Sequence, residues 1–120
     1  MKYVGLLDME TESGTILKNS QLTSKPLSYI LKMFGEGKAK ELGLPPDLAE
    51  LLVSHFNYLM KKKEEGKVII AGPDQAFTRG FFILKAEDLK EAKETIEGDP
   101  FYRQGVFRKE YSILPWFHVI

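Results

Sequence analysis

The stretch Ser54–Pro73, SHFNYLMKKKEEGKVIIAGP, decides the fold of this chain. Its first half is typical of the end of an amphipathic helix, because apolar side chains recur at helical spacing and lysines gather where the helix dipole favours bases. Gly66 is the residue type expected just after a helix, and Val68–Ala71 is an apolar run typical of a strand covered on both faces. The stretch therefore predicts a helix, a tight link and a buried strand.

The helix that ends in this stretch is predicted to begin at Pro46. Proline suits the first helical position, and Asp47 lies in the first turn, where the dipole favours acids. One face of the helix carries apolar side chains and a histidine: Leu48, Leu51, Leu52, His55, Phe56 and Leu59. His55, one of only two histidines, is therefore predicted to lie on the buried stripe and not on the lysine face.

The chain before this helix begins with a predicted strand, Lys2–Leu7, which is rich in β-branched, aromatic and leucine side chains. Met9–Lys25 is rich in Ser, Thr, Glu and Gly and is predicted to be mainly loop. Pro26–Phe34 is predicted to form a short helix that Gly35 stops. Residues 8–45 would thus form an insertion that acts as a lid over a pocket or as extra dimer surface.

The chain after the buried strand continues with a second predicted strand, Arg79–Lys85, close enough to pair with the first as a hairpin. Asp88 begins a second helix in a capping-box pattern. Asp99 and Pro100 then restart the chain as N-cap and first helical residue. In Phe107–Ile113 apolar and polar residues alternate, which predicts a half-buried last strand.

The resulting order, β, insertion, α, β, β, α, β, predicts a ferredoxin-like α+β fold with four antiparallel strands and both helices on one face. At 120 residues we expect one domain, residues 1–120. The other sheet face would stay uncovered, supplied by the first strand together with Phe81 or Phe82, Tyr111 and Ile113. Since an uncovered apolar face implies a partner, we expect a homodimer whose two sheets meet face to face.

The composition excludes several classes of function. Seventeen basic and seventeen acidic side chains cancel, so no overall field would attract nucleic acid or an anionic membrane. There is no cysteine for a disulfide, a thiolate nucleophile or a metal site, and two histidines are too few for a multi-histidine metal site. No apolar run reaches the roughly 18 residues of a membrane-spanning helix. We expect a cytoplasmic protein that uses no metal or cofactor.

Each candidate functional residue also has a purely structural interpretation. A lone histidine such as His55 on an apolar stripe is more often a core residue bonded to a backbone carbonyl than a catalytic base. Asp99 is a good helix cap before proline on structural grounds alone. Gly72-Pro73 needs only a turn to explain it, and Trp116 is more often a core or interface residue than a stacking platform.

Six short pieces of sequence, taken together, resemble the pattern of the YCII-related proteins. In order they are His55-Phe56-Asn57-Tyr58-Leu59, then Gly66 and Ile69-Ile70-Ala71-Gly72-Pro73, then Asp99-Pro100-Phe101, Gly105 and Ile113-Leu114-Pro115-Trp116. The resemblance implies a dimeric ferredoxin-like α+β barrel. It also implies an active site formed by the histidine of the first helix and the aspartate of the Asp-Pro pair, which are His55 and Asp99 here.

The implied pair has a defined chemistry, because a carboxylate bonded to one ring nitrogen fixes the histidine tautomer and makes the other nitrogen a general base. The resemblance therefore implies a lyase or isomerase that performs elimination, isomerisation or tautomerisation on a small aromatic or enol acid. Leu51 stands where family members often carry arginine, so another arginine would have to hold an anionic substrate. Substrate contacts are predicted for four residues of the matched segments: Gly72, Pro73, Phe101 and Trp116.

Two other classes of protein stay open. A non-catalytic homodimeric domain that binds a small ligand or a protein would keep His55 and Asp99 for structure. An RNA-recognition module shares the element order and carries aromatics on its first and third strands, where this chain has Tyr3 and Phe81. The zero net charge, the insertion and Ile83 at the second aromatic position of the third strand argue against RNA.

Overall fold

Four strands form a single sheet in the computed structural model, which describes all of residues 1–120. The strands are β1 (Lys2–Asp8), β2 (Val68–Pro73), β3 (Arg79–Lys85) and β4 (Tyr111–Trp116). They are hydrogen-bonded in the order β2-β3-β1-β4, and every neighbouring pair is antiparallel. The first strand in the chain therefore lies between the third and the fourth, as a ferredoxin-like fold requires.

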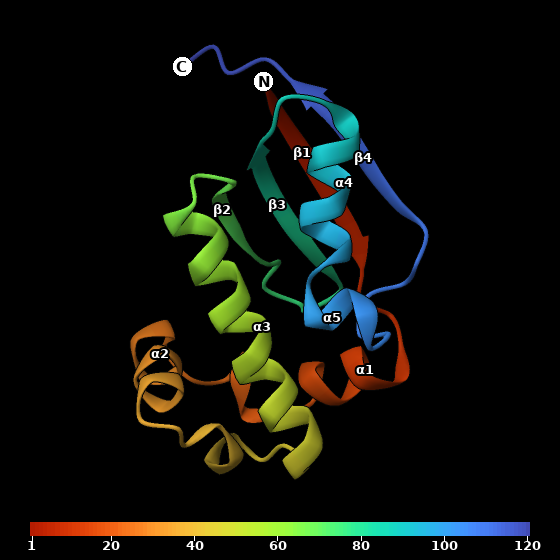
Figure 1. Cartoon of the computed structure of the whole chain (residues 1–120). Coiled ribbons are helices and arrows are strands. Elements are labelled where there is room, and N and C mark those ends of the chain that lie inside the picture. Colours follow the sequence, from red (N-terminus) through yellow and green to blue (C-terminus); the bar gives the residue numbers. More distant parts are fainter.

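The main helices lie together on one face of the sheet (Figure 1). They are α3 (Pro46–Glu64), α4 (Leu89–Glu97) and the short α5 (Pro100–Arg103). Local signals act as predicted at both long helices, since Pro46 opens α3 and the Asp88 carboxylate accepts the N–H of Glu91 at 2.8 Å to cap α4. The predicted ferredoxin-like α+β fold is confirmed.

Alternate side chains of the sheet point into the core between sheet and helices. Tyr3 and Leu7 of β1 are 3% and 0% exposed, and Phe82 and Leu84 of β3 are 2% and 0% exposed. The helices meet them with fully or nearly fully buried residues, among them Leu48, Ala49, Leu52, Ala92 and Ile96. Full burial of a large apolar side chain stabilises the fold by about 1.5–3 kcal/mol, so this layer holds the helices on the sheet.

The opposite face of the sheet exposes apolar side chains. Ile70 of β2 is 58% exposed, Leu114 of β4 is 62% exposed, and Phe81 of β3 is 38% exposed. Of the two predicted phenylalanines it is Phe81 that lies on this open face, while Phe82 points into the core. The prediction that β2 is covered on both faces was wrong, because β2 is an edge strand of an antiparallel sheet with helices on one face only.

The last strand differs from its predicted position and phase. It begins at Tyr111 and not at Phe107, which lies in the core just after α5. Ile113 is opposite Gly5, and a Cβ on Gly5 would collide with Ile96 of α4, so this pair points towards the helices. Tyr111 and Ile113 both pack against the core, and the prediction that they supply the open face was wrong. Alternation in a strand does not reveal which phase faces the helices.

The insertion contains more helix than expected. It holds α1 (Glu12–Lys18), α2 (Leu27–Gly35) and two 3₁₀ turns, η1 (Gln21–Thr23) and η2 (Ala39–Leu42). The Thr11 side chain caps α1 by accepting the N–H of Gly14 at 3.0 Å and donates to the carbonyl of Val106 at 2.7 Å. The rings of Phe34 and Phe56 lie 5.2 Å apart and join α2 to α3. The insertion is therefore a packed part of the domain; its role as lid or dimer surface stays a prediction.

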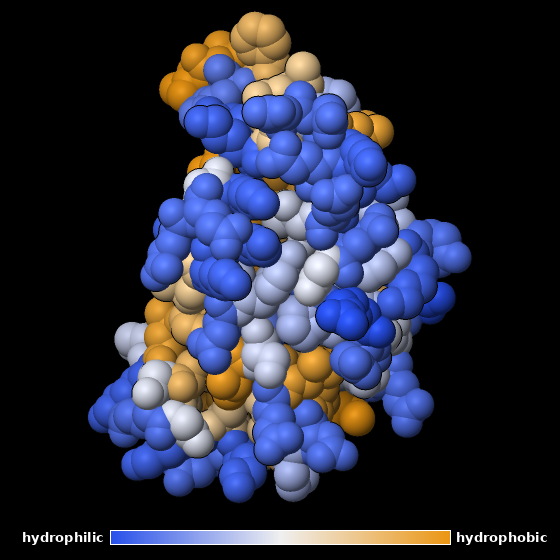
Figure 2. Space-filling model, in the orientation of Figure 1, coloured by the Kyte–Doolittle hydropathy of each residue, from blue (hydrophilic) through white to orange (hydrophobic).

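The surface on the helix side is mostly hydrophilic over α4 (Figure 2). Apolar surface gathers near α2 and α3 and at the C-terminal tail, where Leu27 is 69% and Phe117 is 85% exposed. Figure 1 shows both chain termini at the same end of the sheet. None of the helices combines the length and the apolar character needed to cross a membrane.

Candidate active site

His55 and Asp99 meet between α3 and α5, although 44 positions separate them in the sequence. The Nδ1 atom of His55 lies 2.6 Å from Oδ1 of Asp99. The helical periodicity of α3 turns His55 inward, and the side chain of the histidine is 15% exposed. The pair is thus in direct contact, and its imidazole still reaches the surface.

The position of Asp99 follows from its role as a helix cap. Asp99 has extended backbone geometry, and its Oδ1 atom accepts the N–H of Phe101 at 2.9 Å. Pro100 stands at the first position of α5, where it has no N–H to satisfy. The same oxygen therefore caps α5 and binds His55, so the structural and the functional interpretations of Asp99 apply to one atom.

The Asp99 carboxyl group is buried and only partly satisfied. Asp99 is 0% exposed, and its Oδ2 atom has no hydrogen-bond partner. An ionised carboxylate can only accept hydrogen bonds, so opposite such a carboxylate Nδ1 of His55 is the donor. A neutral imidazole with its hydrogen on Nδ1 has an unprotonated Nε2 atom, which is the form that a general base requires.

Two phenylalanine rings fix the orientation of the imidazole. The ring of Phe101 stacks on His55 with centroids 3.9 Å apart and an interplanar angle of 1°. The ring of Phe107 meets His55 edge to face, with centroids 6.0 Å apart at 76°. Such contacts each contribute about 0.5–1.5 kcal/mol beyond the burial of their area. The histidine is therefore held by one hydrogen bond and two aromatic contacts.

Tyr58 lies one turn after His55 on α3 and also reaches α4. Its hydroxyl donates to the backbone carbonyl of Thr95 at 2.7 Å. Burial of the phenol, followed by the negative charges of Asp99 and Glu65, raises the pKa of Tyr58 to about 12. Tyr58 is therefore a neutral hydrogen-bond donor at physiological pH.

The four predicted substrate contacts lie in different places. Phe101 is part of the site through its stack on His55. Gly72 and Pro73 lie at the end of β2, where Pro73 pairs with Gly80, and Gly80 in turn packs under the ring of Phe107. These two residues are thus linked to the aromatic side of the site through Gly80.

Trp116 lies at the other end of the sheet from the site. It pairs with Lys2, whereas Leu7 of the same strand pairs with Gly80 near the site. These two rows are five residue steps apart along β1, about 17 Å at the rise of a strand. The ring of Trp116 stacks on His118, whose Nδ1 atom lies 2.9 Å from Lys2 Nζ. Within one chain, Trp116 therefore does not join the predicted site.

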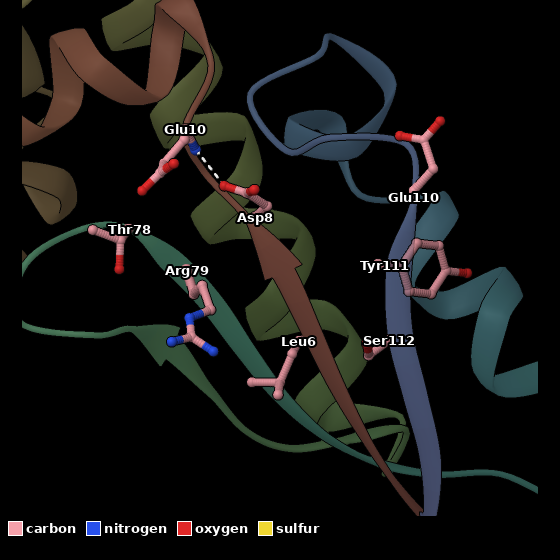
Figure 3. A pocket seen from close by; sticks show the side chains of 8 residues that line it. All are labelled: Leu6, Asp8, Glu10, Thr78, Arg79, Glu110, Tyr111 and Ser112. Carbon is pink, nitrogen blue, oxygen red and sulfur yellow. Dashed lines mark hydrogen bonds between the residues drawn. The ribbon is translucent and has the colours of Figure 1, made fainter.

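A depression of about 580 Å³ lies on the open face of the sheet, at the C-terminal end of β1 (Figure 3). Its lining is mostly polar: Leu6, Asp8, Glu10, Thr78, Arg79, Glu110, Tyr111 and Ser112. A second depression of about 420 Å³ shares Glu10 and Thr78 with it and extends towards α1. Neither is lined by His55 or Asp99. No three His, Asp or Glu side chains gather as they would around a metal ion.

Two residues near the pair were given no role from the sequence. Phe107 was assigned to the last strand, yet its ring contacts His55, Phe101 and Phe82. Tyr58 lies within the matched segment, three residues from His55, and helical spacing alone could have placed it on the same face. No local signal could have identified Phe107, because its position depends on how the chain after α5 folds back.

The arrangement does not suit RNA recognition. Tyr3, the aromatic residue proposed for the first strand, is 3% exposed and points towards the helices, while Phe81 lies on the open face. An RNA platform needs both rings exposed on one face. The RNA hypothesis was therefore wrong in its placement of Tyr3.

The protein is a ferredoxin-like α+β domain in which a helix histidine is bonded to the aspartate of an Asp-Pro helix cap. The chain belongs to the YCII-related domain family, whose model matches residues 31–117. A search of curated proteins found no match. Among solved structures the chain is similar to the 5-chloro-2-hydroxyhydroquinone dehydrochlorinase TftG from Burkholderia phenoliruptrix, in complex with 2,5-dihydroxybenzoquinone. That match has 19% identity and a TM-score of 0.56 over 99% of this chain and 96% of the other, and it shows a shared fold.

Proposed function

We propose that this protein is a small-molecule enzyme in which His55 is the general base and Asp99 orients it. The observation that carries the proposal is the 2.6 Å contact between His55 Nδ1 and Asp99 Oδ1 beside an imidazole that is 15% exposed. A buried carboxylate beside one ring nitrogen and an imidazole that is not fully buried suit general base catalysis. The reaction class is elimination, isomerisation or tautomerisation.

The pair would move one proton. Nε2 of His55 takes a proton from a C–H or O–H bond of the substrate, and the Asp99 carboxylate stabilises the imidazolium that forms. In an elimination, the electron pair of the broken bond forms a new π bond and the leaving group departs with its own pair. In an isomerisation or tautomerisation, the imidazolium returns the proton to another atom of the same substrate. After an elimination, the imidazolium gives its proton to the departed anion or to water, so both sequences restore neutral His55.

The proposed substrates are small oxygenated aromatics or enol acids. The imidazole lies against the rings of Phe101 and Phe107, so the surroundings of the proposed base are apolar and aromatic. The solved relative is named as a dehydrochlorinase of a chlorinated hydroxyhydroquinone, which is a substrate of this class. The sequence-based prediction of a cytoplasmic location accompanies this proposal.

Turnover of chlorinated hydroxyhydroquinones and related enol acids tests the proposal, followed by chloride release and by absorbance of the quinone product. His55→Asn should lower the rate at least about 100-fold. The fold should persist, because the asparagine amide can still donate to Asp99. His118→Asn, the same change at the other histidine, is the control and should retain the wild-type rate. A large loss of stability in His55→Asn, with no substrate turned over by the wild type, would instead support a structural role.

A non-catalytic ligand-binding domain is the second candidate function. It is favoured by the double use of Asp99, which caps α5 and is fully buried, and by the absence of His55 from the lining of the two depressions described above. In that case small aromatic acids would bind without being converted. Calorimetric binding with unchanged ligand recovered afterwards would favour this candidate.

We propose in addition that the protein is a homodimer formed through the open face of the sheet. Ile70, Phe81 and Leu114 expose apolar surface there without cover from the chain. Leu114→Lys should shift the protein to a monomer in light scattering at micromolar concentration. Leu27→Lys is the matched control, because Leu27 on α2 is similarly exposed at 69% but lies away from the sheet. A wild-type monomer at this concentration would contradict the proposal.

A further inference from the structure

The end of α4 carries a backbone carbonyl that the helix itself does not use. In a continued helix the N–H of Asp99 would donate to the carbonyl of Thr95, four residues earlier. Instead it donates to the carbonyl of Ile96 at 3.1 Å, because the chain turns towards α5. The Tyr58 hydroxyl donates to the Thr95 carbonyl at 2.7 Å. A side chain of α3 therefore replaces the backbone donor that the turn removes.

This contact joins the two helices that carry the proposed pair. Tyr58 follows His55 by three residues on α3, and Thr95 precedes Asp99 by four residues, so on each side the two contact points are about one helical turn apart. One bond runs from Tyr58 to Thr95 at 2.7 Å and the other from His55 to Asp99 at 2.6 Å. These two bonds hold α3 at two points, and together they limit both its separation from the turn that presents Asp99 and its rotation relative to that turn.

The residue before Asp99 leaves room for the Tyr58 hydroxyl. A Cβ atom on Gly98 would lie 2.6 Å from the Tyr58 oxygen and 3.3 Å from its Cζ atom. The backbone of Gly98, with φ −80° and ψ −12°, suits any residue, so conformation does not require glycine here. The lack of a side chain at Gly98 is explained instead by the close approach of the tyrosine.

We propose that Tyr58 is a positioning residue, which through its bond to the Thr95 carbonyl sets the distance between Asp99 and His55 and thereby the tautomer of the imidazole. Gly98 is the second part of this device, because it admits the hydroxyl. The effect on turnover rests on the proposed function, whereas the effect on the imidazole does not. Tyr58 acts through Asp99 and is assigned no contact with substrate.

The test is nitrogen-15 and proton NMR of the His55 imidazole in the full-length protein, which reports the Nδ1–H hydrogen bond and the tautomer directly. Wild-type protein should show the Nδ1–H tautomer and a low-field proton resonance. Tyr58→Phe should lose this resonance and populate the other tautomer. Tyr102→Phe, which removes a hydroxyl that donates to the Lys109 carbonyl on the surface, is the matched control and should leave the imidazole unchanged.

A second variant approaches the same contact from the other side. Gly98→Ala should displace the Tyr58 hydroxyl and change the imidazole signals as Tyr58→Phe does. The double variant should change the imidazole signals by less than the sum of the two single changes, since each single variant breaks the same contact. Gly98→Ala also gives an answer if Tyr58→Phe does not fold.

The outcomes separate this inference from the proposed function. Unchanged imidazole signals in Tyr58→Phe would overturn the positioning role, even if the variant is less stable. If Tyr58→Phe does not fold, unchanged signals in Gly98→Ala would overturn it in the same way. Absence of the Nδ1–H tautomer from the wild type would overturn the pair itself and with it the proposed function. If turnover is found, Tyr58→Phe should lower kcat by about 10- to 100-fold with little change in KM, because misplacement affects the chemical step.

Discussion

Asp99→Asn separates the charge of the carboxyl group from its role as a helix cap. The asparagine oxygen can still accept the N–H of Phe101, which donates to Oδ1 at 2.9 Å in the wild type. Asparagine is about as good an N-cap as aspartate, so α5 should keep its cap. The change therefore tests the charge on His55 while the local backbone is retained.

The expected change in stability is small because two terms oppose each other. A hydrogen bond to a charged group contributes about 1.5–3 kcal/mol and a neutral one about 0.5–1.5 kcal/mol, so the bond to His55 weakens by about 1–1.5 kcal/mol. Removal of the charge also removes the cost of a fully buried carboxylate whose Oδ2 atom has no partner. We expect the free energy of unfolding to change by less than about 1 kcal/mol.

The expected change in activity is large. The amide oxygen that keeps the cap at the Oδ1 position can still accept from Nδ1 of His55, but it carries no charge to stabilise the imidazolium that forms when Nε2 takes the substrate proton. The transition state therefore loses stabilisation, and kcat should fall by about 100- to 10,000-fold. The weaker hydrogen bond should be visible as an upfield shift of the Nδ1 proton resonance.

Asp99→Ala completes the comparison, because it removes the cap as well as the charge. Loss of the cap and of the bond to His55 should together lower the free energy of unfolding by about 2–4 kcal/mol. Urea unfolding with a common m-value measures both variants. If Asp99→Asn loses as much stability as Asp99→Ala while the Nδ1 proton resonance does not shift, the carboxylate is structural and the reasoning above is refuted.

Three further predictions follow from the packing and the charges. The folded protein holds the pKa of Tyr58 at about 12, above its unfolded value. This phenol therefore contributes stability that is complete below about pH 10 and is lost as the pH rises towards 12. Tyr58→Phe should flatten that part of a pH series of urea unfolding. Gly80→Ala would place a Cβ 2.7 Å from the ring of Phe107 and should lower the free energy of unfolding by about 1–3 kcal/mol. A decrease of less than about 0.5 kcal/mol would show that the ring moves freely. A hydrogen bond from the Thr78 hydroxyl lowers the pKa of Asp74. The Asp74 carboxylate therefore stabilises the hairpin at pH values above the pKa it has in the unfolded chain, and this stabilisation is lost as the pH falls through its pKa in the folded protein. Asp74→Asn should remove this acid dependence from the hydrogen exchange of the hairpin amides.

The sequence by itself determined the order of the main elements and the local geometry of the candidate pair. Helical periodicity placed His55 on the buried stripe of α3, and the Asp-Pro signal placed Asp99 at the start of α5. These features depend on a few neighbouring residues, so they can be predicted without knowledge of the rest of the chain. The contact between the two residues was proposed from the family resemblance, and the helical packing brings them to 2.6 Å.

Only the tertiary structure decided which residues surround the pair and which do not. Strand alternation leaves two phases open, and the packing of α4 on Gly5 selected the phase that turns Ile113 inwards. The register of β1 placed Trp116 at the far end of the sheet, although the sequence pattern groups it with the site residues. Phe107 and the Tyr58 contact with Thr95 arise where segments far apart in the sequence cross. Such contacts depend on the relative placement of whole elements, which local residue preferences do not specify.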